Sequence, residues 1–136
     1  MKLWQFRDFK SDRGENAIHS WLHDEADAAR ADINDLIAVL EVLNKDAFSR
    51  EDNTGQLHDR MGQNCVGLIE LRVKVKGVQY RPIGFYGPGR KVVTLLAGAT
   101  ERDRKLNPTN ICDTAKQRKD LVELNQERYS CEHDFR

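Results

Sequence analysis

The segment 69–76 constrains the fold of this chain more than any other part of the sequence. Apolar residues stand at its odd positions and charged residues at its even ones: Ile69, Leu71, Val73 and Val75 against Glu70, Arg72, Lys74 and Lys76. A two-residue period places successive side chains on opposite faces of a β-strand. We therefore predict a strand whose apolar face packs on helices. Its other face displays cations about 7 Å apart, close to the spacing of phosphates in an extended nucleic-acid strand.

Two more strands are predicted directly after this one. Gly77 supplies a turn, and residues 78–86 return as a second strand that contains Tyr80 and Arg81. Pro82 lacks a backbone N–H, so this strand lies at an edge or turns its proline nitrogen away from a neighbour. Gly87-Pro88-Gly89 is a second turn signal, and an apolar run over 92–96 is typical of a central strand. Residues 67–97 thus form an antiparallel meander.

Helical periodicity flanks the meander on both sides. A short strand over residues 3–9 and a capped turn at 11–14 precede apolar residues at helical spacing over 17–22 and 27–43, which predict a helical hairpin. Residues 44–64 are polar and predict a long loop. Asn107-Pro108 reads as a helix start, which predicts a closing helix up to about residue 124.

These elements predict a single compact α+β domain, with the N-terminal strand and helical hairpin packed on an antiparallel meander sheet and a closing C-terminal helix. The domain occupies residues 1–125, and 126–136 form a loose polar tail. No run approaches the ~18 apolar residues needed to span a bilayer, and the first residues lack the apolar core of a signal peptide. We expect a cytoplasmic protein without membrane contact.

Neither a metal nor another cofactor is expected. The cysteines Cys65, Cys112 and Cys131 are odd in number and irregularly spaced, so we expect all three to be reduced. His19 and His23 stand four residues apart on a predicted helix, but the sequence offers no HExxH glutamate and no evident third ligand. We interpret them as surface histidines.

The charge of the chain is unevenly distributed. The formal net charge is zero, which by itself argues against nucleic-acid binding because phosphate affinity comes from clustered Lys and Arg. Residues 1–60, however, carry 8 Lys/Arg and 13 Asp/Glu, and residues 71–100 carry six basic residues and no acid: Arg72, Lys74, Lys76, Arg81, Arg90 and Lys91. An anionic partner is therefore expected at the meander.

Several short motifs, in this order, resemble the RelE/ParE/HigB superfamily of toxins, and in particular its HigB-like, phage-associated branch. They are Gly14-x-x-x-Ile18-x-x-Trp21-Leu22, then Gly67-Leu68-Ile69-Glu70-Leu71-Arg72, then Tyr80-Arg81, and finally Leu95-Leu96 followed by a charged segment and Pro108. One departure stands at 99–105, where acids interrupt the basic residues and the family's aromatic residue and lysine pair are missing.

The resemblance implies a type II toxin: a ribosome-dependent endoribonuclease that cleaves messenger RNA without a metal, and that a cognate antitoxin protein neutralises. It implies attack of a ribose 2′-hydroxyl on the adjacent phosphate, which needs a base, cations that stabilise the phosphorane, and an acid for the leaving oxygen. The residues carried over as catalytic are Arg72, Lys74, Arg81, Arg104 and Lys105. Those expected to bind RNA are Lys76, Tyr80, Arg90, Lys91 and Arg102.

Three of these positions have individual hypotheses. Arg81 clamps the scissile phosphate with two hydrogen bonds, Lys74 is a candidate base, and Tyr80, or alternatively Tyr86, stacks on a nucleotide base. The competing interpretations are a solvated sheet face for the cations and a core position for the tyrosine. Glu70 is expected to form an ion pair with an arginine and orient it.

Two other functions fit the same fold. One is a ParE-like inhibitor that binds gyrase without cleaving RNA, which agrees with the altered 99–105 segment. The other is a domesticated or phage-borne relative that serves as a binding or assembly module, which agrees with the neutral net charge.

Overall fold

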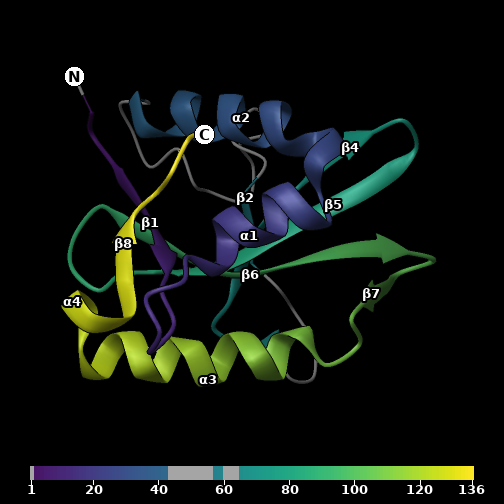
Figure 1. Cartoon of the computed structure of the whole chain (residues 1–136). Helices are drawn as coiled ribbons and strands as arrows, with labels where there is room; N and C mark the ends of the chain where they lie inside the picture. The colour runs from purple at the N-terminus through teal and green to yellow at the C-terminus, as the bar shows by residue number, and fades with distance from the viewer. Residues whose placement is uncertain (1, 43–56, 60–64) are drawn as a thin grey trace.

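The computed structural model describes residues 2–42, 57–59 and 65–136, which form a compact α+β fold (Figure 1). Helices alternate along the chain with strands that form one mixed, mostly antiparallel sheet. The elements are β1 (Gln5–Phe9), α1 (Ala17–Asp24), η1 (Asp27–Ala29), α2 (Arg30–Val42), β2 (Leu57–Asp59), β3 (Ile69–Leu71), β4 (Val73–Val75), β5 (Val78–Tyr86), β6 (Val92–Arg102), β7 (Lys105–Asn107), α3 (Ile111–Leu124), α4 (Gln126–Tyr129) and β8 (Ser130–Glu132). The predicted fold class is confirmed.

The sheet follows the order β2-β3-β5-β6-β1-β8, while β4 pairs with β5 and β7 pairs with β6. Within this sheet β1 runs parallel to β6, with Gln5 opposite Val92 and Asp8 opposite Leu95. The other described pairs are antiparallel. The meander over 67–97 is thus confirmed. The first strand of the chain, β1, pairs with the last strand of this meander, β6.

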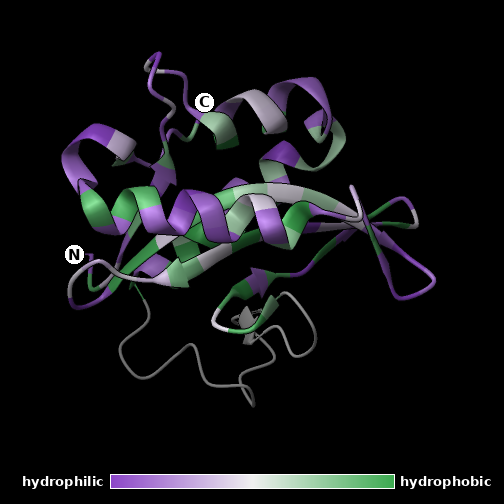
Figure 2. Ribbon diagram, turned by 90° about the horizontal axis from the view of Figure 1, so that it is seen from below, coloured by the Kyte–Doolittle hydropathy of each residue, from purple (hydrophilic) through white to green (hydrophobic). Residues whose placement is uncertain are grey.

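Helices cover both faces of the sheet (Figures 1 and 2). The helices α1 and α2 lie on one face, where Phe6, Trp21, Ile33 and Leu95 belong to one buried apolar cluster. Helix α3 lies on the other face, over a second buried cluster around Ile83. Hydrophobic colour follows the central strands, and hydrophilic colour marks the hairpins that extend beyond the helices. The middle of the sheet is therefore buried on both faces, and the sheet reaches solvent at its hairpin ends.

Pro82 fits within β5 because no strand needs its missing N–H. It lies between residues 83–84, which pair with β3, and residues 78–80, which pair with β4. On the other side it stands opposite Gly98 of β6. The prediction that its nitrogen points away from a neighbouring strand agrees with this interruption.

The structure corrects several predicted boundaries. Strand β6 continues to Arg102 and forms a hairpin with β7, where a loop was expected, because Asp103 and Arg104 adopt positive φ angles of 52° and 65° and close a two-residue turn. Helix α3 starts at Ile111, with Asn110 as N-cap, and not at Pro108. Most of the predicted loop over 44–64 lies outside the described residues.

The C-terminal residues are not the loose tail that was expected. Residues 126–132 form α4 and β8, and β8 pairs with β1, as Figure 1 shows on the left of the sheet. The His133 N–H then donates to the Phe6 carbonyl at 3.0 Å. The last residues thus complete the edge of the sheet next to the first strand.

The expectation of three reduced cysteines is wrong for two of them. Cys65 and Cys112 form a disulfide that joins the segment before β3 to α3, and Cys131 is free. The spacing of the cysteines did not predict this pair, because the two residues are 47 positions apart and only the fold brings them together. No helix in the described part of the chain is long and apolar enough to cross a bilayer.

Candidate functional site

The cations predicted at 72 and 74 do point outward. Arg72 and Lys74 are exposed, whereas Leu71 and Val73 between them are buried. The predicted alternation is confirmed, although the strand is interrupted at Arg72 and becomes β3 and β4. Glu70 is the exception on the charged face: it is fully buried, and its Oε1 lies 3.1 Å from Arg72 Nε.

Arg81, the hypothesised phosphate clamp, is held inside the protein. Its side chain is 6% exposed, with Nη2 3.3 Å from Glu101 Oε2 and Nε 3.8 Å from Glu70 Oε2. The guanidinium also donates to the Tyr80 carbonyl at 3.2 Å and to the Gln79 side chain. Two carboxylates thus neutralise Arg81, and the expected ion pair between Glu70 and an arginine is confirmed. In this position the guanidinium is not available to a phosphate.

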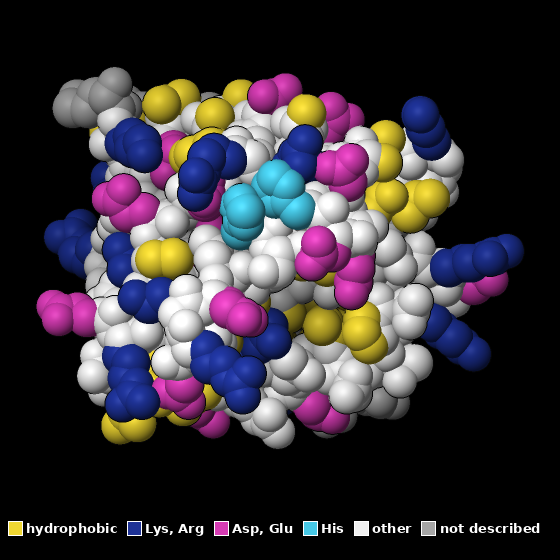
Figure 3. Space-filling model, in the orientation of Figure 1, with side chains coloured by type: hydrophobic (Ala, Val, Ile, Leu, Met, Phe, Trp, Pro, Cys, Tyr) yellow, Lys and Arg dark blue, Asp and Glu magenta, His cyan; other side chains and the backbone are white. Residues whose placement is uncertain are grey.

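Exposed cations gather instead where the β4–β5 and β6–β7 hairpins end. They come from neighbouring strands because β4 pairs with β5, β5 with β6, and β6 with β7. We name this surface the cationic hairpin end, and its members are Arg72, Lys74, Lys76, Arg102, Arg104 and Lys105. Within residues 72–81 and 99–107, Asp103 is the only exposed carboxylate. Figure 3 shows Lys and Arg side chains projecting from this side of the molecule, on the right of the view.

The cationic hairpin end presents its charges on two faces. Lys74 stands opposite Gln79, and Gln79 stands opposite Glu101, so these three share one face of the sheet. Arg102 follows Glu101 and stands opposite Lys105, so both belong to the other face. The residues predicted as catalytic are therefore neighbours, but they do not all converge on one face.

Three residues predicted to bind RNA lie elsewhere. Arg90 and Lys91 are exposed in the turn between β5 and β6, at the opposite end of both strands from the cationic hairpin end. Tyr80 is 7% exposed and packs edge-on against Trp21, with ring centroids 6.4 Å apart. The core interpretation of Tyr80 is therefore the one that its packing favours.

The two helical histidines lie side by side without forming a metal site. Their ring centroids are 4.1 Å apart. His23 Nδ1 faces Arg30 Nη1 at 2.6 Å and His23 Nε2 faces the Arg136 carbonyl at 2.7 Å, so both of its nitrogens are occupied. His19 Nε2 lies 3.7 Å from Asp134. Among the residues that the structure describes, no group of three His, Cys, Asp or Glu side chains is arranged to hold a metal ion.

A buried polar network was missed by the sequence analysis. His133 Nδ1 lies 2.8 Å from Asp8 Oδ1, and His133 Nε2 lies 2.7 Å from Asn34 Oδ1. The second oxygen of Asp8 accepts from Asn16 Nδ2 at 2.9 Å, and Asn34 donates to the Phe135 carbonyl at 3.0 Å. All three central residues are buried. The network ties β1, α1 and α2 to the end of the chain, and neither Asp8 nor His133 belongs to a motif that would have revealed it.

This network has the Asp–His pair of a nucleophilic site, but within the described ranges 2–42, 57–59 and 65–136 it contacts no activated nucleophile. The nearest thiol, Cys131, lies 3.5 Å from the Asn16 amide nitrogen. Burial, followed by the charge of Asp8, raises the pKa of the Cys131 thiol, which disfavours the reactive thiolate. We therefore interpret the network as structural: its hydrogen bonds hold the C-terminal residues against β1 and α2, and we call it the C-terminal lock.

Comparisons of this chain with known protein families, with curated proteins and with solved structures find no match.

Proposed function

We propose that this chain is a toxin of the RelE/HigB type that binds messenger RNA on the ribosome and cleaves it, with the cationic hairpin end as its RNA-binding surface. The observation that carries the proposal is the concentration of six exposed Lys and Arg residues, with one exposed carboxylate, on the paired ends of four strands. Clustered cations supply phosphate affinity by releasing counterions, whatever the net charge of the whole chain.

The order of the elements supports the resemblance. A strand, two helices, a meander and a closing helix follow one another as the motifs imply. The exposed Arg72 and Lys74 stand at the positions that correspond to the toxin motif, and Glu70 of that motif forms ion pairs with Arg72 and Arg81. Glu70 would thus act by positioning the cations.

In the proposed reaction, the ribose 2′-hydroxyl loses its proton and attacks the adjacent phosphorus, the bond to the 5′-oxygen breaks, and that oxygen leaves with a proton. The products are a 2′,3′-cyclic phosphate and a 5′-hydroxyl. Lys74, which is exposed on β4, is the candidate base, while Arg72 and Arg104 stabilise the charge on the phosphorane. Arg81 is a positioning residue here because two carboxylates occupy its guanidinium.

A second candidate function is inhibition by binding alone, in the manner of ParE. It is favoured by the neutralised Arg81 and by the placement of Arg102 and Lys105 on the face opposite Lys74. Cations on two faces of the sheet can contact an extended acidic partner, but fewer of them can contact a single phosphate group. Under either function, the antitoxin would place an acidic segment on the cationic hairpin end.

Primer-extension mapping of cellular transcripts after brief induced expression tests the proposal. Wild type is compared with a Lys74→Ala plus Arg104→Ala variant and with a control, Arg90→Ala plus Lys91→Ala, which loses the same charge at the far end of the strands. We expect new 5′ ends within translated regions for wild type and the control, and none for the first variant. Growth arrest with intact transcripts and lost gyrase supercoiling would establish the binding function instead.

A further inference from the structure

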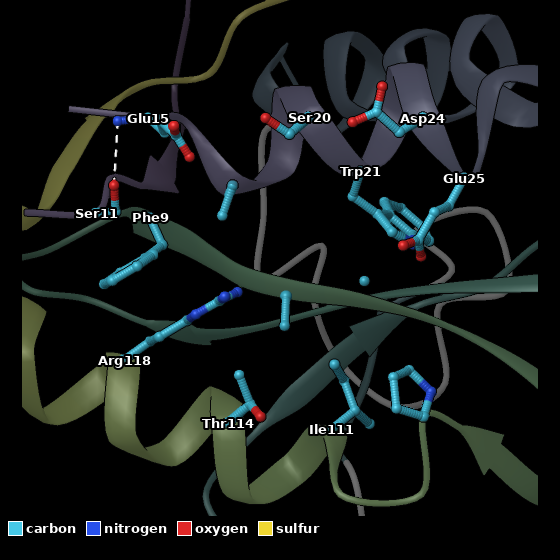
Figure 4. Close-up of a pocket in the computed structure, with 14 residues that line it drawn as sticks. Phe9, Ser11, Glu15, Ser20, Trp21, Asp24, Glu25, Ile111, Thr114 and Arg118 are labelled. Atoms are coloured by element: carbon cyan, nitrogen blue, oxygen red, sulfur yellow. Dashed lines mark hydrogen bonds between the residues drawn. The ribbon is translucent and has the colours of Figure 1, made fainter. Parts of the chain in front are cut away.

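A pocket lies at a gap in the sheet, away from the cationic hairpin end. Strand β5 pairs with one side of β6 over residues 93–101, so β1 and β7 both pair with its other side, at 92–95 and at 100–102. Residues 96–99 of β6 are left between them as an open edge. A cavity of about 410 Å³ lies at this edge, and Ala97 and Gly98 are among the residues that line it. Figure 4 shows labelled lining residues of α1 on one side of it and of α3 on the other.

The open edge offers backbone hydrogen-bonding groups to the cavity. Gly98 stands opposite Pro82, which has no N–H, so this pair is not hydrogen-bonded and the Gly98 N–H and C=O point away from β5. The β6–β7 hairpin leads to the same conclusion. Arg102 and Lys105 flank its two-residue turn, so they form a hydrogen-bonded pair and the backbone N–H and C=O of Arg102 point toward β7. The backbone groups of every second residue before Arg102, including Gly98, point to the same side of β6. The Gly98 N–H and C=O thus offer one hydrogen-bond donor and one acceptor to the cavity.

Glycine is required at this point of the edge. A Cβ atom at position 98 would lie 2.0 Å from Trp21 Cδ2, so the indole of α1 packs directly on the backbone of β6. Trp21 thereby forms the roof of the cavity, and Ile111 from α3 lies on the opposite wall. The cavity therefore combines a strand edge with mixed walls: Trp21 and Ile111 are apolar, whereas Asp24, Glu25 and Arg118 are charged.

Arg118 brings a positive charge into this cavity. Its Nη1 donates to the Leu96 carbonyl at 2.8 Å, and its guanidinium lies over the Phe9 ring at 5.0 Å. Burial lowers the pKa of Arg118, and no carboxylate of the described residues lies within 4.0 Å of its nitrogens. Figure 4 shows Arg118 and Glu25 reaching toward the cavity from opposite sides. Glu15, Asp24 and Glu25 also line the cavity, but none of them forms an ion pair with Arg118. Arg118 is thus the one cation among the lining residues, and its partly desolvated guanidinium can still bond to an anionic ligand group.

We propose that this pocket binds the C-terminal end of an extended peptide, whose main chain pairs with Gly98 and whose terminal carboxylate bonds to Arg118. Phe9 and Ser11 line the cavity on the side of β1, and Pro108 lines it on the side of β7. The open edge is only four residues long, which suits two or three residues of a chain end. Edge-strand pairing and carboxylate capture are both established modes of peptide recognition.

The test is an NMR titration of the full chain with acetyl-Ala-Ala-Ala carrying either a free carboxylate or a carboxamide at its end. We expect the acid to shift the Gly98 amide signal and to bind at least tenfold more tightly than the amide, as the loss of a charge-assisted hydrogen bond predicts. Equal binding of acid and amide, or no shift of Gly98 at millimolar peptide, would overturn the proposal.

Two further arms separate the causes. Arg118→Gln keeps a donor for the Leu96 carbonyl but removes the charge, and should weaken binding of the acid about tenfold; Lys116→Gln on the same helix removes one charge outside the pocket and should leave it unchanged. Acetate alone should bind far more weakly than the peptide. Equal binding of acetate would reduce the pocket to a simple anion site and would also overturn the peptide assignment.

Discussion

Replacing Arg81 by methionine should strongly destabilise the protein. The substitution keeps roughly the same side-chain volume but removes the guanidinium that lies 3.8 Å from Glu70, which is fully buried, and 3.3 Å from Glu101, which is 19% exposed. Removing one member of a buried ion pair costs about 3–5 kcal/mol because the remaining charge stays desolvated. Arg72 still lies 3.1 Å from Glu70, so we expect the lower end of that range.

This cost converts into a measurable shift of the melting temperature. With an unfolding entropy of roughly 2.1 cal/mol/K per residue, Tm of a 136-residue chain falls by about 3.5 °C per kcal/mol, so a loss of about 3 kcal/mol in Arg81→Met should lower Tm by roughly 10 °C. Thermal unfolding followed by circular dichroism at pH 7 measures the shift. The matched control is Arg90→Met, an exposed arginine for which we expect a change below about 0.5 kcal/mol.

The double variant Glu70→Gln plus Arg81→Met separates the ion pair from simple packing. Because it removes the buried charge together with its partner, it should recover part of the stability lost in Arg81→Met. A loss below about 1 kcal/mol in Arg81→Met, or no recovery in the double variant, would refute the structural role given to Arg81. It would then favour Arg81 as a direct phosphate ligand.

Four further outcomes follow from the described contacts. His133→Ala should destabilise the protein by about 1–3 kcal/mol, since Asp8 Oδ1 would stay buried and lose its hydrogen-bond partner at 2.8 Å; a loss below about 0.5 kcal/mol in chemical denaturation would contradict this role of the network. At pH 8, Cys131 should react with iodoacetamide more slowly in the folded chain than in the unfolded one, because its thiol pKa is raised and the thiolate is scarce; equal rates would contradict this. Thiol titration of the denatured, unreduced chain should find one thiol, and three after reduction. Breaking the Cys65–Cys112 bond should cost about 4 kcal/mol for its 47-residue separation.

Local periodicity predicted the strands and the helical hairpin because these elements carry their own signal. The alternation over 69–76 placed Arg72 and Lys74 on the exposed side correctly, but it did not reveal the interruption at Arg72 or the burial of Glu70. Burial of Arg81 was not predictable in the same way. Its exposure depends on Glu101, which stands opposite Gln79 on a strand about twenty residues later.

Long-range pairings explain the remaining differences. The sequence around Asp103 and Arg104 carries no glycine or asparagine, so its positive-φ turn and the β6–β7 hairpin had no local signal. The polar terminus appeared loose because the partners of His133, Asp8 and Asn34, are 125 and 99 residues away in the sequence. Where the C-terminus packs is decided by buried polar contacts that no local pattern reveals.

Binding of a labelled single-stranded RNA to the purified chain, measured by fluorescence anisotropy at several salt concentrations, tests the central claim most directly. We expect affinity to fall with salt, with a slope of roughly −0.7 per phosphate contacted. A Lys74→Gln plus Arg104→Gln variant should lose affinity and reduce the slope by about 1.4, whereas Arg90→Gln plus Lys91→Gln should resemble wild type. Equal loss in both variants, or no binding at low salt, would contradict an RNA surface at the cationic hairpin end.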